Sequence, residues 1–505
     1  MAKFKAYDYS QLVFLPVCLE DQLIPGTLEF AIHTLVETQM DMSVFEDKYN
    51  NDETGRAAYD PKVLLKVVLL AYSRGITTSR KIEQACRENI TFMALACGQK
   101  PDHSTIAAFV STMKEQVLPL FRDVLLVCDQ EGLLGGTMFA LDGCKLKGNA
   151  SRQWSGRVED FERKKNKIEN KVRQMLDEQG EVDKREGSGS DGILGRDKSK
   201  QIERLKKQAA RIGKWLRENE PKIGATGKEI KSNITDNESA SMATDTSGAL
   251  QGYNGQALVD SKHQIIVHGD ASGKGSDGSH VPPMIDGAKE NLQQIGHPED
   301  YFAGKILTAD SDYHSHENLA KCIEEDLDAY IPDKRFRTRD PRFRIKKRSM
   351  KNRKRFMLDD FIYDKVQDYY KCPQGNILKL NAKNTITTGV IYNRYVADEK
   401  DCSVCTMRHK CLTAKGGKRR YLMVPVGSTE DNLSKKMQAK IDSEQGRRIY
   451  PLRMAIVEPV FANIRTQKRL DHFTLRSRAK VRIQWLLYCL VHNIEKILHY
   501  GEVYA

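Results

Sequence analysis

Two apolar runs that each end in an aspartate constrain the fold of this chain more than any other feature. Asp142 follows the run Met138–Leu141, and Asp310 follows the run Lys305–Ala309. Short apolar runs of this length are typical of buried strands. Polar residues that follow neighbouring strands meet at one edge of a sheet, where the functional sites of α/β proteins form. The two aspartates are therefore expected to lie close together.

The surrounding pattern predicts the other elements of the same sheet. In chain order we expect a strand at 136–142, a hairpin of strands at 252–260 and 263–268, a helix at 282–292, a strand ending at Asp310, a helix at 314–325 and a strand at 329–331. Helices follow from about residue 431, and Trp485 lies in an apolar stretch that predicts a core position. The fold class is α/β, with a mixed sheet covered by helices.

A third acidic residue, Glu458, lies in the helix-like stretch Tyr450–Arg465. Two carboxylates at strand ends and one on a helix can hold two divalent ions about 4 Å apart, an arrangement that drives in-line displacement at phosphorus. Asp312 competes with Asp310 as the second ligand, because both share one face of an extended strand. Asp310 is preferred since it directly ends the apolar run, and Asp260 is interpreted as a turn residue.

Length and composition limit the class of protein. A chain of 505 residues is too long for one core and predicts two to four domains. It contains no run of about 18 apolar residues, and its first residues lack an apolar signal core. We therefore expect a cytoplasmic protein without a membrane span.

The net charge of +13 is concentrated in one segment. Residues 334–355 contain 13 Lys and Arg against the single acid Asp340, which leaves the rest of the chain near +1. Phe336, Phe343 and Phe356 are interleaved with these charges, and this favours a strip that follows the backbone of a polyanion over a solvated loop. The candidate phosphate ligands are Arg344, Lys346, Lys347 and Arg348.

The first 130 residues predict short helices joined by tight turns. Pro61 suits the first position of a helix, and Thr77 or Thr78 can cap the next one, which carries Arg80 and Lys81. This arrangement is typical of a helix-turn-helix DNA reader, with Arg80 and Lys81 as DNA ligands. A helical bundle used for assembly fits the pattern equally well.

A charged segment separates the first predicted strand from the hairpin. Between Gln153 and Pro221, apolar residues recur at helical spacing in two blocks, and the flexible connector Gly187–Gly192 lies between the blocks. The pattern predicts two helices that fold back as an antiparallel coiled-coil hairpin. DNA clamping, dimer contacts and spacing are all compatible with it.

Four of the eleven cysteines lie close together in one region of the sequence. Cys402 and Cys405 are separated by two residues, Cys411 follows, and Cys372 precedes them in a neighbouring loop. Four thiolates without an open position suit a structural Zn²⁺ ion. His409 is an alternative ligand, and unliganded reduced thiols are the alternative state of the cluster.

Taken together, these motifs resemble those of bacterial insertion-sequence DDE transposases, in the group whose third acidic residue lies in a Tyr-Arg-Glu-Lys motif. The residues that carry the resemblance are Tyr59–Pro61, Ser79–Glu83 and Pro101–Thr105, then Leu141–Gly143, Gly252–Asn254, Gln256, Asp260 and Thr308–Tyr313, and finally Tyr450, Arg453, Glu458 and Arg465. Arg465 stands in place of the usual Lys, and one additional residue separates Arg453 from Glu458.

The resemblance implies an RNase H-like core, two Mg²⁺ ions held by Asp142, Asp310 and Glu458, and DNA cleavage followed by transfer of a 3′-hydroxyl to target DNA. From the residues themselves, the cations near Glu458, which include Arg453, Arg465 and Lys468, are expected to hold the adjacent phosphates, and Tyr450 is a further candidate for DNA binding. The expected partners are double-stranded DNA, both element ends and target, and further copies of the chain in a homodimer or higher oligomer, associated with the bacterial nucleoid. An RNase H-like nuclease without strand transfer and a domesticated DNA-binding regulator are the alternatives.

The expected division of the chain follows from these segments. It comprises a helical N-terminal domain for DNA binding or assembly at 1–130, the first part of the core at 131–152, the coiled-coil insertion at 153–230, the continued core at 231–332, the basic zinc-binding insertion at 333–425 and C-terminal core helices at 426–505.

Overall fold

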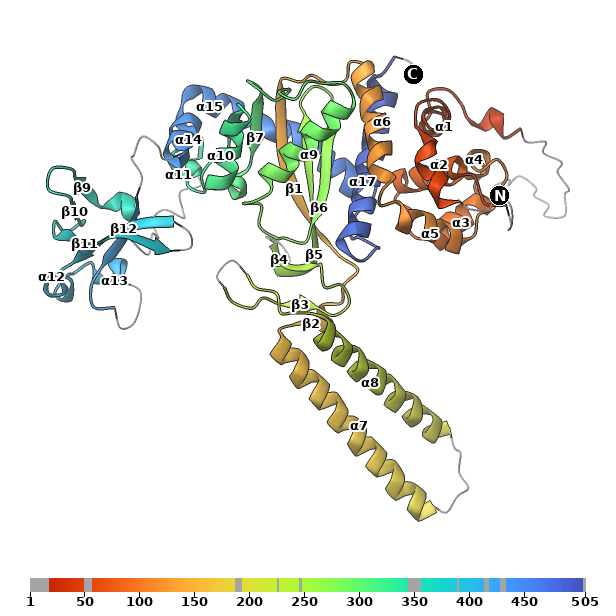
Figure 1. Cartoon of the computed structure of the whole chain (residues 1–505), viewed down its shortest axis with the longest axis horizontal. Coiled ribbons are helices and arrows are strands. Elements are labelled where there is room, and N and C mark those ends of the chain that lie inside the picture. Colours follow the sequence, from red (N-terminus) through yellow and green to blue (C-terminus); the bar gives the residue numbers. More distant parts are fainter. Residues whose placement is uncertain are drawn as a thin grey trace, which may run out of the picture.

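The computed structural model describes residues 18–49, 57–186, 193–224, 227–244, 248–343, 356–387, 390–412, 417–426 and 433–502. A central sheet is flanked by helices, a long helical hairpin projects from one end of it, and a small β-rich unit lies to one side (Figure 1). No helix among the described residues is both long and apolar enough to cross a membrane.

The central sheet is mixed, as the sequence predicts. Its strands are β1 (Met138–Lys147), β4 (Ala240–Thr244), β5 (Gly248–Asp260), β6 (Ile266–Ser272), β7 (Ile306–Ala309) and β8 (Asp328–Tyr330). The strand order is β4-β5-β1-β7-β8, and β6 also pairs with β5. β5 runs antiparallel to β1, β4 and β6, whereas β1, β7 and β8 are parallel.

The first strand is longer than the sequence predicts. The expectation that it ends at Asp142 is wrong, because β5 continues to pair with β1 as far as Lys147, opposite Gly252. The parallel partner β7, in contrast, pairs only with Met138–Leu141. Asp142 therefore lies inside β1 but at the end of the parallel pairing.

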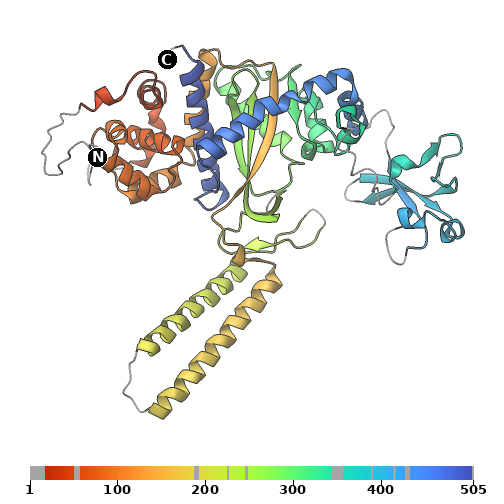
Figure 2. The ribbon, with the colours of Figure 1, turned by 180° about the vertical axis from the view of Figure 1, so that it is seen from behind.

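Helices cover both faces of this sheet. On β6, His268 fits against Gly287 of α9 (Val281–Gln294), while the next residue, Gly269, fits against Trp485 and Cys489 of α17 (Arg478–Tyr500). Successive strand residues point to opposite faces, so the two helices lie on opposite sides, as Figures 1 and 2 also show. The predicted helix at 314–325 is present as α10 (His316–Glu324).

The predicted core position of Trp485 is confirmed. Its ring is fully buried and its indole N–H donates to the backbone carbonyl of Gln256 at 2.9 Å. The ring also lies so close to Gly255 that a Cβ there would approach it to 3.0 Å. α17 therefore fixes the middle of β5, the strand that pairs with β1.

The N-terminal region is helical, as expected. Its helices are α1 (Leu28–Thr38), α2 (Pro61–Ser73), α3 (Ser79–Glu88), α4 (Ile90–Leu95), α5 (His103–Thr112) and α6 (Val117–Gln130), with short turns η1 (Glu20–Gln22) and η2 (Met42–Lys48). Asp60 caps α2 through the N–H of Lys62, and Pro61 is the first helical residue. Apolar residues of these helices share one core with α17 and the sheet.

The charged segment after β1 forms two long helices, α7 (Val158–Glu186) and α8 (Ile193–Glu218), which run side by side (Figure 1). At their base lie η3 (Arg152–Trp154) and the two-stranded sheet of β2 (Ser155–Gly156) and β3 (Ser232–Asn233). Phe161 and Trp215 pack edge to face with centroids 4.8 Å apart, within a small core that includes Ile212 and Ile234.

The segment after β8 contains a second sheet that the sequence analysis did not predict. After α11 (Phe336–Arg339) and η6 (Leu358–Asp360), the strands β9 (Ile362–Asp364), β10 (Tyr369–Lys371), β11 (Ile377–Thr387), β12 (Val390–Ala397) and β13 (Tyr421–Pro425) pair in the order β13-β12-β11-β10-β9, joined by α12 (Glu399–Ser403) and α13 (Arg408–Cys411). The chain then returns through α14 (Leu433–Asp442), α15 (Glu444–Ile449) and α16 (Leu452–Ala462).

Candidate functional site

The sheet register brings Asp142 and Asp310 to equivalent positions on neighbouring strands. The last parallel pair of β1 and β7 is Leu141 with Ala309, so the next residue on each strand is an aspartate. The Asp310 side chain accepts the N–H of Asp312 at 2.8 Å and caps the short turn η4 (Ser311–Tyr313). The structure therefore places two carboxylates, 168 residues apart in sequence, at one point of the sheet edge.

Asp142 is largely buried and is paired with Arg453 at the start of α16. Arg453 Nη1 donates to Asp142 Oδ2 at 2.5 Å, and the two side chains are only 11% and 18% exposed. Burial raises the pKa of Asp142 to about 6, and the nearby Asp310 adds to this rise, while Arg453 opposes it. Burial also raises the pKa of Asp310. The site thus holds two desolvated carboxylates that a cation would stabilise.

A layer of buried amides lies beside the two carboxylates, and sequence reasoning missed it. Asn254 and Gln256 point to the same side of β5 and donate to Asp277 Oδ1 at 2.6 and 2.9 Å. Tyr313 donates its hydroxyl to Gln256 Oε1. Burial raises the pKa of Tyr313, and Asp277, Asp142 and Asp310 raise it further. All these groups therefore belong to one connected site.

This amide layer explains why a glycine follows Asp142. A Cβ on Gly143 would come within 2.1 Å of Gln256 Nε2 and 2.8 Å of Asn254 Oδ1. Asn254 is fully buried, and its Oδ1 has no hydrogen-bond partner among the described residues. The alternation of Asn254 and Gln256 within an otherwise apolar strand was the available sequence signal, whereas Asp277 lies in a Gly- and Ser-rich loop without any periodic pattern.

Glu458 occupies a different position from the two aspartates. It lies on α16, the helix that carries Arg453, but its side chain is exposed and makes no hydrogen bond or ion pair within the described part of the chain. Among those residues, no group of three or more His, Cys, Asp or Glu has the geometry of a metal site. Asp142 and Asp310 are thus brought together, and Glu458 is left free on the adjacent helix.

The two competing aspartates after β7 differ in their surroundings. The Asp312 side chain is 47% exposed and forms an ion pair with Lys334 at 3.2 Å. Asp310 instead lies beside Arg453 and within the field of Asp277. Asp260 accepts the N–H groups of Gly135, Gly136 and Lys262, which is the turn role that the sequence indicates.

The residues expected to contact DNA have varied positions. Arg80 and Lys81 are exposed on α3, and Tyr450 is half-buried near Arg453. Arg465 is exposed in the π-helix η7 (Asn463–Gln467), which directly follows α16. Burial raises the pKa of Cys144 to about 12 while Arg465 opposes the rise, so Arg465 lies near β1. Arg344, Lys346, Lys347 and Arg348 lie outside the described residues.

Lys468 does not have the exposed position that a phosphate ligand requires. Its side chain is completely buried, and its ammonium group is paired with Glu495 of α17 and donates to Asn463 Oδ1. A buried cation with a carboxylate partner is a structural element, because breaking such a pair leaves an uncompensated charge. The assignment of Lys468 to DNA is therefore corrected.

The four clustered cysteines are partly buried and form no disulfide at one end of the second sheet. Burial raises the pKa of Cys411, and the thiols of Cys402, Cys372 and Cys405 raise it further, so the four sulfurs are neighbours. The described residues nevertheless include no group with metal-site geometry. The four cysteines that are close in sequence are thus also close in space, but they do not form a preformed tetrahedral site.

Two family models match the chain. A model described as "Transposase DDE domain" matches residues 371–498, and a model described as "Transposase domain (DUF772)" matches residues 17–112. Both matched regions are thus similar to domains of transposases, and neither match covers half of the chain. None of the curated proteins compared with the chain matches it.

Proposed function

We propose that this chain is a metal-dependent transposase that cleaves DNA at the ends of a mobile element and joins the resulting 3′-hydroxyl to target DNA. The observation that carries the proposal is the register that sets Asp142 and Asp310 side by side after a parallel strand pair. The mixed sheet with these two residues at its edge supports an RNase H-like core.

We assign Asp142, Asp310 and Glu458 as the ligands of two Mg²⁺ ions. Carboxylate oxygens are the ligands that Mg²⁺ prefers, and the raised pKa values of Asp142 and Asp310 fit a site whose carboxylates need a cation. Bound ions of this kind activate the attacking oxygen and stabilise the leaving oxygen. Glu458 has a free, exposed carboxylate on the helix next to Asp142 and would complete the set.

The cations around this site have a role of their own in the proposal. Arg453 neutralises Asp142 in the free protein, and a guanidinium there can also hold a phosphate oxygen through a bidentate contact. Arg465 is exposed in the π-helix η7, which directly follows α16. We propose that Arg453, Arg465 and Tyr450 orient the scissile phosphate, while Arg80 and Lys81 on α3 contact the duplex further away.

A strand-transfer assay with pre-cleaved ends, with and without Mg²⁺, tests the proposal. Joined product supports a transposase, cleavage alone supports a nuclease without strand transfer, and a mobility shift without chemistry supports a DNA-binding regulator. Glu458→Gln is expected to abolish joining while DNA binding persists. Joining that survives this substitution would remove Glu458 from the site.

We further propose that Cys372, Cys402, Cys405 and Cys411 bind a structural Zn²⁺ ion. The support is the spatial grouping of four thiols in a unit with a small core, which is the situation in which a metal adds folding free energy. Metal analysis of the purified protein should find about one Zn²⁺ per chain by this assignment. Replacement of Cys402 and Cys405 by Ser should remove it, and an equal zinc content in that variant would disprove the site.

The proposed partners are double-stranded DNA and a second copy of the chain. Joining two element ends to one target requires two active sites, and this favours a dimer or a higher oligomer. Light scattering with and without end DNA distinguishes a preformed dimer from one assembled on DNA.

A further inference from the structure

The two helices of the hairpin differ sharply in charge. α8 carries nine Lys and Arg against three acidic residues, whereas α7 carries eight against nine. Only the apolar seam between the helices is needed to hold the hairpin together. The excess of cations on α8 is therefore not needed to hold the two helices together.

The cations of α8 form a stripe on the side away from α7. The stripe consists of Lys200, Arg204, Lys207 and Arg211, all exposed. These positions are separated by four, three and four residues, so they lie on one face of the helix. The seam residues Ile202, Leu205, Ala209 and Ile212 occupy the opposite face. The stripe therefore points to solvent along about 17 Å of helix axis.

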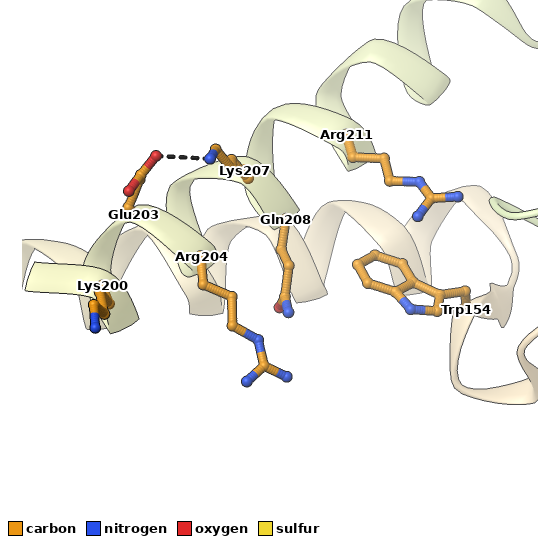
Figure 3. A pocket seen from close by; sticks show the side chains of 7 residues that line it. All are labelled: Trp154, Lys200, Glu203, Arg204, Lys207, Gln208 and Arg211. Carbon is orange, nitrogen blue, oxygen red and sulfur yellow. Dashed lines mark ion pairs between the residues drawn. The ribbon is translucent and has the colours of Figure 1, made fainter. Parts of the chain in front are cut away.

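The charge of the stripe is mostly uncompensated. Within the described part of the chain, Lys200, Arg204 and Arg211 make no ion pair, and only Lys207 is paired, with Glu203 at 2.6 Å. Figure 3 shows this pair and the cations that line the same pocket. An ion pair between side chains as exposed as these is worth little. Lys207 can therefore exchange Glu203 for a phosphate at small cost.

An aromatic residue anchors the base of the stripe. Trp154, from η3, faces Arg211 (Figure 3). The guanidinium of Arg211 lies 5.5 Å from the centroid of the Trp154 ring, and the ammonium group of Lys164 lies 4.3 Å from the same centroid. Trp154 in turn packs against the small core at the base of the hairpin. This contact orders Arg211 in advance and reduces the entropy lost when it binds a partner.

We propose that this stripe, with Trp154 at its base, is a second DNA-binding surface that follows the phosphate backbone of a duplex at a distance from the carboxylate site. Double-stranded DNA presents one negative charge about every 1.7 Å, so a run of four exposed cations meets several phosphates over about five base pairs. The identity of the partner rests on the proposed function, but the stripe does not depend on strand transfer.

The opposite flank of the seam offers a matched control. Lys165, Arg173, Lys206 and Arg217 line a separate pocket between α7 and α8. This set also contains two Lys and two Arg, but it includes Lys165, which faces Glu169 at 3.7 Å, and no aromatic ring lines its pocket. Substituting either set with Gln removes four charges and retains good helix formers.

The test measures binding of the full-length protein to a blunt duplex of random sequence, in Ca²⁺, over a range of salt concentrations. For the variant K200Q/R204Q/K207Q/R211Q we expect at least about tenfold weaker binding at low salt and a slope of log K against log salt that is shallower by about 3 to 4. The control variant K165Q/R173Q/K206Q/R217Q should change the slope by less than about one. Circular dichroism checks that both variants keep their helices.

Every other outcome overturns the inference. Equal losses in both variants would show an effect of net charge alone, and unchanged binding in both would exclude the surface. The stripe variant could instead bind DNA normally but lose binding to anionic lipid vesicles, or change its oligomeric state in light scattering. Either result would assign the stripe to a different partner. Strand transfer with pre-cleaved ends is measured separately, so that failure of the proposed chemistry and failure of the stripe remain distinguishable.

Discussion

The carboxylate site and the helical hairpin are built on opposite principles. At the site, the contacts join residues that are far apart in sequence: Arg453 reaches Asp142 across 311 positions, and Trp485 reaches Gln256 across 229. In the hairpin, the contacts join two consecutive helices through a repeating seam. The site therefore depends on the whole fold, whereas the hairpin depends mainly on its own sequence.

The two regions also treat charge in opposite ways. The site buries Asp142 against Arg453 and leaves the neighbouring Asp310 with a raised pKa. The hairpin exposes the cations of the stripe, and most of them have no acidic partner among the residues that the structure describes. Buried charge of the first kind is expensive unless it is compensated. Exposed charge of the second kind is suited to attraction over a long surface.

The largest expected effect separates Asp310 from its neighbour Asp312. We expect Asp310→Asn to lower strand transfer by about a thousandfold or more, because a catalytic unit fails when one member is lost. Asp312→Asn, which removes an exposed carboxylate paired with Lys334, should lower it by less than about tenfold. Rates with pre-cleaved ends in Mg²⁺ measure both, and equal losses would contradict the assignment of the second ligand.

The sequence predicted the parts of each region that depend on local patterns. Apolar runs gave the strands around Asp142 and Asp310, and helical spacing gave α7 and α8. The layer of Asn254, Gln256 and Asp277 was missed, because it exists only when a strand and a distant loop meet. Likewise, the burial of Lys468 depends on Glu495 from another helix, and no pattern around Lys468 indicates that partner.

The second prediction tests whether the two regions unfold separately. Phe161→Ala and Trp485→Ala each remove a buried aromatic ring, and each should cost about 3 to 5 kcal/mol. Loss of Phe161 should raise amide exchange in α7 and α8 only, since its core cluster is confined to the base of the hairpin. Loss of Trp485 should lower the melting temperature of the sheet and its helices together. Global exchange in the Phe161 variant would show that the hairpin is coupled to the core.

The third prediction concerns the amide layer. Asp277→Asn keeps the shape of the side chain but removes the charge that faces Asn254, Gln256 and Asp310. A supporting group of this kind is worth about 10- to 100-fold in metal affinity or activity. We expect a loss in that range, together with a higher Mg²⁺ concentration for half-maximal activity. Mutating the exposed Asp300 provides a control, and an unchanged metal requirement would make Asp277 a purely structural residue.

The smallest expected effect is a loss of stability at acidic pH, which should affect the central sheet but not the hairpin. The sheet contains His268, fully enclosed beside Asn291 and Gly287, and burial lowers its pKa to about 4. In the unfolded chain this histidine has its ordinary pKa of about 6.5. Between pH 6.5 and 4 the unfolded state therefore binds more protons than the folded state. The free energy of unfolding falls as the pH falls through that window. From pH 6 to 5 this histidine should remove about 1 kcal/mol.

Neither helix of the hairpin contains a histidine, so its own stability should not share this loss. Urea unfolding at pH 6 and pH 5 gives the change in the free energy of unfolding for the wild-type protein and for His268→Gln. The difference between the two changes is due to His268, since other buried groups such as His492 titrate equally in both proteins. The variant should be less stable at pH 6 because the Asn291 contact is altered, but its loss on going to pH 5 should be smaller by about 1 kcal/mol. An identical pH dependence in the two proteins would mean that His268 reaches solvent and accepts a proton without unfolding of the sheet.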